Sequence, residues 1–209
     1  MSPERHRGFR GLSRDSREVA GGAGGVSENL AHRMADQARD EELMREALRL
    51  AREGLDAGEP PIGALVALNG EVIASARRRV SGETVLDHSE VVVLRDALSD
   101  PRLRGRRRDA VLYTTLEPCL MCMGTAMFFR VRRIVYALEA VADGASEVAQ
   151  VWQPDVGHPP PGSYLYDVPD VTGGVCRDEA LALFRLFAEQ NRHLLWAQAL
   201  LPDFARGEA

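Results

Sequence analysis

Apolar residues recur at helical spacing between Asp40 and Gly58. The stripe consists of Met44, Leu48, Ala51 and Leu55. Intervals of four, three and four residues place these side chains on one face of a helix. The glycine and the two prolines of the following segment, AGEPP, end the pattern. We therefore expect a helix that begins near Asp40 and ends just before Gly58.

The segment IGALVALNGEVIASA has the pattern of two strands joined by a tight turn. Apolar and β-branched residues dominate both halves, and Asn69-Gly70 stands between them. Asn-Gly is a strong hairpin signal because both residues tolerate a positive φ. The runs AVLYTTL, RRIVYAL and YDVPDVTGG predict three further strands.

Helices are predicted between and after these strands. One runs from about His88 to Leu98, the next is opened by Pro118 at its first position, and the last runs from Arg177 to about Leu201. Residues 141–165 contain GHPPPGSY and predict a long loop. A hairpin followed by strand–helix–strand alternation predicts an α/β fold in which a mixed sheet carries helices on both faces.

Composition narrows the class of protein. Residues 1–36 are rich in Arg, Ser and Gly and predict a flexible tail, so residues 37–205 form the expected folded domain. No stretch approaches the roughly 20 apolar residues of a membrane span, and we expect a cytoplasmic protein without membrane contact. The net charge of −5 argues against a broad nucleic-acid-binding face. The chain has no lysine, which excludes Schiff-base and Walker A chemistry.

The short motif DHSE allows two interpretations. Asp87 and Glu90 have the spacing of a capping box at the start of a helix. Alternatively, His88 binds a metal ion and Glu90 moves protons. The motif alone does not decide between a structural and a catalytic role.

A second motif, Cys119-x-x-Cys122, decides in favour of catalysis. The spacing places both sulfurs on one face of a helical first turn, where the helix N-terminus stabilises thiolates. Helices that follow parallel strands begin at the same sheet edge, so His88 can join them. Two thiolates and one imidazole form a zinc set with an open fourth position, as in catalytic sites. H-x-E with P-C-x-x-C is the signature of zinc-dependent nucleobase deaminases, with Glu90 as the general acid and base. The third cysteine, Cys176, has no partner motif and is expected to be a buried apolar residue.

These motifs resemble the cytidine/deoxycytidylate deaminase superfamily, in the branch that contains bacterial tRNA adenosine deaminase, guanine deaminase and fungal-type cytosine deaminase. The resemblance covers roughly residues 40–200 and includes PPIGALVALNGEVIASA, LYTTLEPCLMC, RVRRIVYAL and VTGGV. It implies a three-layer α-β-α sandwich with a five-stranded mixed sheet, one zinc ion per chain, and a homodimer or higher homo-oligomer. It also implies hydrolysis: water activated by zinc attacks the amine-bearing ring carbon, and Glu90 carries the protons.

The resemblance leaves the substrate open. tRNA adenosine deaminases have an asparagine after the second strand and an aspartate after the fourth, and the matching positions here are Arg78 and Ala140. These departures favour a free nucleobase, nucleoside or related small amino-heterocycle. tRNA adenosine-to-inosine deamination is the alternative, since the arginines at 77–79 and 102–108 can contact phosphates. A non-catalytic, zinc-stabilised scaffold subunit is a further alternative, against which the presence of Glu90 argues.

Six residues are candidates for contact with the substrate. They are Arg78, Ser89, Glu117, Phe128, Trp152 and His158. An arginine suits an acidic or carbonyl-bearing group, and the two aromatic rings can stack on a base. Ser89 stands between the metal-binding histidine and the glutamate, and Glu117 precedes the metal-binding helix. His158 lies in the Pro-rich segment, which can close over a substrate.

Overall fold

The computed structural model describes residues 24–80, 84–151 and 168–201. The chain forms two units, Met1–Ala35 and Asp36–Ala209, and the sheet and the site lie in the second. The helices are α1 (Gly24–Asp56), α2 (Ser89–Ala97), α3 (Leu120–Phe129), α4 (Ser146–Val151), α5 (Arg177–Gln190) and α6 (Leu195–Ala199). The strands are β1 (Gly63–Leu68), β2 (Glu71–Arg77), β3 (Ala110–Leu116), β4 (Arg133–Leu138) and β5 (Asp170–Thr172). None of the described helices combines the length and the apolar character of a membrane span.

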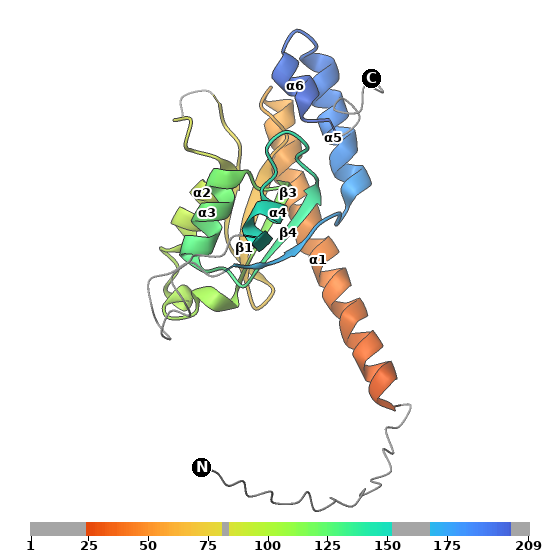
Figure 1. Cartoon of the computed structure of the whole chain (residues 1–209), viewed down its shortest axis with the longest axis vertical. Helices are drawn as coiled ribbons and strands as arrows, with labels where there is room; N and C mark the ends of the chain where they lie inside the picture. The colour runs from red at the N-terminus through yellow and green to blue at the C-terminus, as the bar shows by residue number, and fades with distance from the viewer. Residues whose placement is uncertain (1–23, 81–83, 152–167, 202–209) are drawn as a thin grey trace, which may run out of the picture. The chain divides into compact units, whose positions relative to one another are not determined.

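The five strands form one mixed sheet in the order β2-β1-β3-β4-β5. β1 is antiparallel to both of its neighbours, whereas β3, β4 and β5 run parallel. β2 and β3 therefore run in the same direction and end at the same edge of the sheet. The predicted α/β sandwich with a five-stranded mixed sheet is confirmed (Figure 1).

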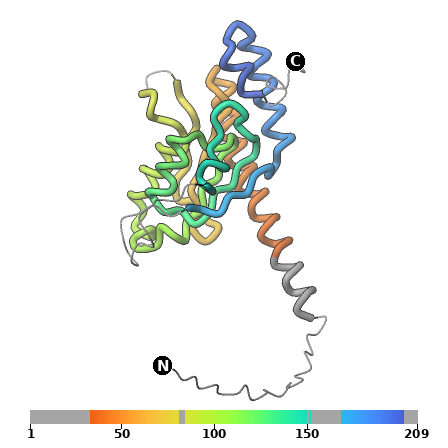
Figure 2. The backbone as a smooth tube through the Cα atoms, viewed as in Figure 1, coloured from red at the N-terminus to blue at the C-terminus, as the bar shows by residue number. Residues whose placement is uncertain are grey.

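Alternation along the central strands builds one hydrophobic core on each face of the sheet. In β1, Ala64 and Val66 pack with α2 and α3, and Leu65 and Ala67 pack with α1 and α5. β3 and β4 contribute to both cores in the same way. Figure 2 shows the backbone of these layers, with the sheet between the two groups of helices. This burial of both faces explains why β1 and β3 are fully buried strands.

The hairpin predicted from Asn69-Gly70 is confirmed. Both residues have positive φ, 54° and 81°, and they connect β1 to β2 directly. A positive φ at both central positions gives the turn a twist that matches the flanking strands.

The helix boundaries differ from the prediction at both ends of the chain. α1 begins at Gly24 instead of near Asp40, because good helix formers, including three Ala and two Arg, are spread through the segment before Asp40, which has no proline. The prediction of a flexible tail lies outside the described residues for positions 1–23. The expected C-terminal helix is divided at Asn191 into α5 and α6. The division lets Trp196 pack against Phe187, with ring centroids 5.6 Å apart.

Two predictions near the middle of the chain are corrected. Pro118 is not the first residue of a helix, because α3 begins at Leu120 with Cys119 as its N-cap. The segment 141–165 is not entirely loop, because α4 occupies Ser146–Val151 within it. Its residues 152–165 lie outside the described residues.

A buried polar cluster fastens α1 to the sheet. The carboxylate of Asp40 accepts hydrogen bonds from the Tyr113 hydroxyl (2.8 Å) and from the Arg133 guanidinium (2.7 Å). Arg133 also donates to Oγ1 of Thr172 at 2.8 Å. The side chain of Asp40 is only 9% exposed, so its charge is compensated by neighbouring groups rather than by water.

We expect Asp40→Ala to lower the free energy of unfolding by roughly 3 kcal/mol, because it leaves the Arg133 guanidinium and the Tyr113 hydroxyl without their acceptor. Urea unfolding of the zinc-loaded protein measures this loss. The control is Glu42→Ala on the same helix, whose side chain is 73% exposed and which should change the stability by less than about 0.5 kcal/mol. Equal effects of the two substitutions would contradict the role of the cluster.

Candidate metal centre and catalytic pocket

Three metal-binding side chains meet at the sheet edge where β2 and β3 end. His88 is the N-cap residue of α2, Cys119 is the N-cap residue of α3, and Cys122 lies in the first turn of α3. His88 precedes the two cysteines by 31 and 34 residues. The shared direction of β2 and β3 starts both helices at one edge, as predicted from the sequence.

The distances between the ligand atoms fit a zinc ion. Nδ1 of His88 lies 3.7 Å from Sγ of Cys119 and 3.5 Å from Sγ of Cys122, and the two sulfurs are 3.5 Å apart. Tetrahedral zinc with Zn–S bonds of about 2.3 Å and Zn–N bonds of about 2.0–2.1 Å requires separations of about 3.5–3.8 Å. Among the described residues the set has three protein ligands, which would leave the fourth position of a tetrahedral zinc ion open.

The two thiols differ in their readiness to ionise. The hydrogen bond between the two cysteine sulfurs, together with the contact to His88, lowers the pKa of the Cys119 thiol to about 4. The bond to Cys119 and burial raise the pKa of the Cys122 thiol. Contact with Cys119 also raises the pKa of His88. Zinc binds thiolates and neutral imidazole, so metal binding releases any protons that these groups carry.

Glu90 lies beside these ligands with its side chain buried and only 4% of the residue exposed. Oε1 accepts a hydrogen bond from Oγ1 of Thr114 at 3.2 Å, and Oε2 accepts one from Oγ of Ser89 at 3.1 Å. Burial raises the pKa of the Glu90 carboxyl. A carboxyl group held in one orientation with a raised pKa is suited to accept and return a proton.

The alternative interpretation of Glu90 as part of a capping box is wrong. The N-cap of α2 is His88 rather than Asp87, and no side chain caps that helix end. The Asp87 carboxylate instead accepts hydrogen bonds from the backbone N and Oγ1 of Thr84, both at 3.1 Å. Asp87 thus fixes the turn that leads to His88.

A pocket of about 380 Å³ opens beside the metal ligands. It is lined by Pro60, Ile62, Arg78, Val80, His88, Ser89, Glu90, Leu116, Glu117, Cys119, Asp143, Trp196 and Leu200. Three of the predicted substrate-binding candidates, Arg78, Ser89 and Glu117, therefore line the pocket. Trp152 and His158 lie outside the described residues, and their roles stay predictions.

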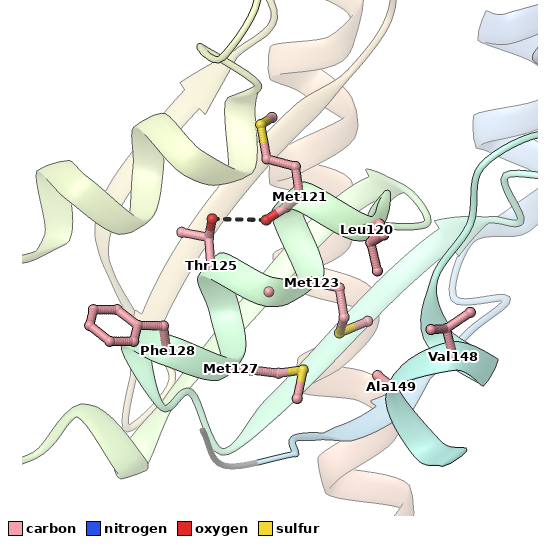
Figure 3. A pocket seen from close by; sticks show the side chains of 9 residues that line it. Leu120, Met121, Met123, Thr125, Met127, Phe128, Val148 and Ala149 are labelled. Carbon is pink, nitrogen blue, oxygen red and sulfur yellow. Dashed lines mark hydrogen bonds between the residues drawn. The ribbon is translucent and has the colours of Figure 1, made fainter. Parts of the chain in front are cut away.

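Phe128 does not line this pocket. It is 62% exposed near the end of α3 and borders a separate apolar hollow between α3 and α4 (Figure 3). Leu120 and Val148 line the same hollow. Phe128 lies nine residues beyond Cys119, on the far part of α3, which separates it from the catalytic pocket and removes the expected stacking role.

Glu117 holds the loop between β4 and α4. Its Oε2 accepts a hydrogen bond from the backbone N of Ala140, and its Oε1 accepts one from the backbone N of Ser146, each at 3.1 Å. Gly144 packs so closely on this carboxylate that a side chain there would collide with it. Glu117 therefore positions the loop that carries Asp143 into the pocket wall.

Asp143 and Trp196 were not predicted as site residues. Neighbouring protein atoms displace part of the water around Asp143, and this desolvation, followed by the charge of Cys119, raises the pKa of its carboxyl. Trp196 comes from α6, 48% exposed, and forms another part of the wall. The only sequence feature that pointed to Asp143 was its place in the segment A-D-G-A-S, a loop after the fourth strand. Trp196 reaches the pocket because α5 and α6 are separate helices.

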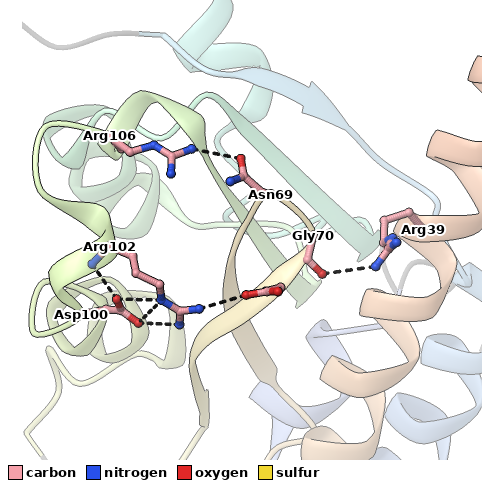
Figure 4. A network of polar contacts seen from close by, with 7 residues as sticks. Arg39, Asn69, Gly70, Asp100, Arg102 and Arg106 are labelled. Carbon is pink, nitrogen blue, oxygen red and sulfur yellow. Dashed lines mark hydrogen bonds and ion pairs between the residues drawn. The ribbon is translucent and has the colours of Figure 1, made fainter.

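The arginine-rich loop before β3 lies at the opposite edge of the sheet. Loop 100–109 leads into the beginning of β3, whereas Cys119 follows the end of β3. Figure 4 shows Arg102 with Asp100 and Arg106 with Asn69 around the hairpin turn. β3 has seven residues and spans about 23 Å at about 3.3 Å per residue, so this loop does not reach the catalytic pocket.

Comparison with known proteins identifies the family. The model of the cytidine and deoxycytidylate deaminase zinc-binding region matches residues 37–138. The tRNA-specific adenosine deaminase of Agrobacterium fabrum is 36% identical over 156 residues, which cover 72% of this chain and 94% of that protein. The chain belongs to the cytidine and deoxycytidylate deaminase family. The matched region contains His88, Cys119 and Cys122, and the cofactor is one zinc ion at this cluster.

Two solved structures of related deaminases have similar folds. A structure from a study of A-to-I editing by tRNA:A34 deaminases at the wobble position of transfer RNA is 35% identical, with a TM-score of 0.54, and the match covers 67% of this chain and 96% of that one. The guanine deaminase from Nitrosomonas europaea is 27% identical, with a TM-score of 0.53, covering 71% and 84%. These relatives act on different substrates, so family membership alone leaves the substrate of this deaminase open.

We expect Cys122→Ser to reduce the zinc content of the purified deaminase from one ion per chain to well below one, because the three-ligand set has no spare protein ligand among the described residues. Metal analysis after dialysis measures the content. Cys176→Ser is the matched control: Cys176 lies outside the triangle, and its thiol contacts the carbonyl oxygen of Glu41 at 3.9 Å. Zinc retained by Cys122→Ser, or lost from Cys176→Ser, would contradict the assigned ligand set.

Proposed function

We propose that this deaminase hydrolyses the exocyclic amine of a free nucleobase, a nucleoside or a related small amino-heterocycle. The observation that carries the proposal is the buried carboxyl of Glu90 beside the three zinc ligands at one end of a walled pocket. A pocket volume of about 380 Å³ lies in the range of small-molecule sites.

Glu90 is the proton carrier in the proposed reaction. When bound, zinc acts as a Lewis acid that makes water nucleophilic near neutral pH. The Glu90 carboxylate accepts a proton from the attacking water and delivers protons to the ring nitrogen and the departing amine. Water is consumed, ammonia leaves, and the ring carbon gains an oxo group. The hydrogen bonds from Ser89 and Thr114 keep both carboxylate oxygens in place for these transfers.

Asp143 and Trp196 supply further contacts for a flat, polar ring. The Asp143 carboxyl faces the pocket and offers a hydrogen-bonding group for a ring N–H or an amine. The indole of Trp196 offers an aromatic surface, and stacking on a base is worth about 1–3 kcal/mol. The two residues come from different segments, so together they restrict the orientation of the ring.

Deamination of adenosine in tRNA is the second candidate function. The 36% identity to a protein named a tRNA-specific adenosine deaminase favours it. Two departures weigh against it, since Arg78 and Ala140 replace the expected asparagine and aspartate. Ala140 is 7% exposed, and its methyl side chain cannot hydrogen-bond to a nucleic acid. The position of the arginine-rich loop at the opposite sheet edge also weakens this candidate.

A non-catalytic scaffold role has less support. Glu90 is present, buried and hydrogen-bonded beside the zinc ligands, which is the arrangement that catalysis requires. The expected homodimer or higher homo-oligomer and the cytoplasmic location stay predictions.

We expect the zinc-loaded protein to release ammonia from at least one of cytosine, guanine, adenine or their nucleosides. Glu90→Gln should lower kcat by about 10²–10⁴-fold with the zinc content unchanged, because the amide cannot accept the proton. Glu189→Gln, exposed on α5, is the control and should behave as the wild type. Turnover confined to an adenosine-containing anticodon stem-loop would support the tRNA alternative. Wild-type turnover by zinc-loaded Glu90→Gln would contradict both deaminase proposals.

A further inference from the structure

Arg78 directly follows β2 and lines the pocket, and the strand sets the direction of its side chain. Its backbone N donates to the carbonyl of Ile62 at 2.7 Å, which continues the β1–β2 ladder by one step. The side chain of the preceding Arg77 approaches α1 at Gly54. Because side chains alternate along a strand, Arg78 points to the other face of the sheet, where α2 and the pocket lie.

One arm of the guanidinium is held by the backbone next to the metal. Nη1 of Arg78 donates to the carbonyl oxygen of Asp87 at 2.5 Å, in the peptide that leads into His88. The Asp87 side chain is itself tied to Thr84, so the acceptor is fixed. This bond fixes the position of the guanidinium relative to the zinc ligands.

Arg78 lines the pocket, and in the part of the chain that the structure describes no carboxylate pairs with its guanidinium. A guanidinium has five N–H donors, and within the described ranges the side chain of Arg78 makes only the bond to Asp87. Its side chain is half-buried and lines the wall that also contains Glu90 and Asp143. A planar donor group at a pocket wall is best satisfied by an oxygen that accepts two N–H bonds.

We infer that Arg78 selects substrates whose ring or substituent carries an oxygen acceptor, either an oxo group or an anionic group such as phosphate. The inference rests on the proposed function, and it narrows the substrate class to amino-heterocycles with such an oxygen. A ring without the oxygen, such as adenine, leaves the fixed guanidinium unpaired. A site built to hydrogen-bond a substrate group rejects analogues that lack it for this reason.

Binding measured without turnover tests the inference. The zinc-loaded full-length Glu90→Gln protein is titrated calorimetrically with cytosine, guanine and adenine, and with cytidine, CMP, adenosine and AMP. The titrations are repeated with a double variant that carries Glu90→Gln and Arg78→Gln. The control double variant carries Glu90→Gln and Arg104→Gln, since Arg104 is exposed in the loop at the opposite sheet edge. Comparison of cytosine and guanine with adenine tests whether Arg78 binds an oxo group. Comparison of CMP and AMP with their nucleosides tests whether it binds a phosphate.

The expected result is a loss of about 30-fold or more in affinity for the oxygen-bearing ligands on adding Arg78→Gln. Adenine and adenosine should change by less than about threefold, and the zinc content should stay at one per chain. Arg104→Gln should change neither. Affinities that depend on Arg78 no more than on Arg104 would overturn the inference. Loss of zinc from the Arg78→Gln protein would also overturn it, because the residue would then act on His88.

Ammonia release by the wild type separates this inference from the proposed function. If Arg78-dependent binding is found but the wild type releases ammonia from none of these compounds, the proposed function fails and the assignment of Arg78 stands. If ammonia is released and binding does not depend on Arg78, the assignment of Arg78 fails and the proposed function stands.

Discussion

The direction that β2 and β3 share determines where the three zinc ligands lie. Both strands end at one edge of the sheet, so α2 and α3 begin there and bring His88 to Cys119 and Cys122 across more than 30 residues. β1 lies between β2 and β3 and is antiparallel to each of them, so β2 and β3 point the same way. The buried polar cluster around Asp40 then fastens α1 against the sheet on the opposite face.

Burial of the Glu90 carboxyl costs stability but suits proton transfer. A carboxyl buried as deeply as Glu90 destabilises its charged form, which raises its pKa. Hydrogen bonds from Ser89 and Thr114 reduce that cost and fix the orientation of the group. The same burial keeps bulk water from competing for the proton. Stability and proton transfer therefore make opposite demands on Glu90, and its two hydroxyl donors satisfy both.

The parts of the site that short motifs encode were predictable. The C-x-x-C spacing places Cys119 and Cys122 on one helix turn, whereas His88 and Glu90 were assigned from H-x-E taken together with P-C-x-x-C, the signature of zinc-dependent deaminases. The hairpin at Asn69-Gly70 was also predictable, because the turn depends on the tolerance of these two residues for a positive φ.

Groups that reach the pocket through tertiary packing were not predictable. Asp143 depends on a loop held by Glu117, and Trp196 depends on the division between α5 and α6. Phe128 has the chemistry of a stacking residue, but its place on α3 turns it to another surface. Arg78 lies between these cases: its position was visible in the sequence, and its contact with the Asp87 carbonyl was not.

Zinc X-ray absorption on the zinc-loaded full-length protein tests the central claim most directly, because it counts the sulfur atoms bound to the metal. An open catalytic site held by His88, Cys119 and Cys122 predicts two sulfurs at about 2.3 Å and two nitrogen or oxygen atoms at about 2.0–2.1 Å. Three sulfurs would bring in Cys176 and contradict the assigned ligand set, and four sulfurs, which require a second chain, would describe a closed structural site and contradict the catalytic interpretation.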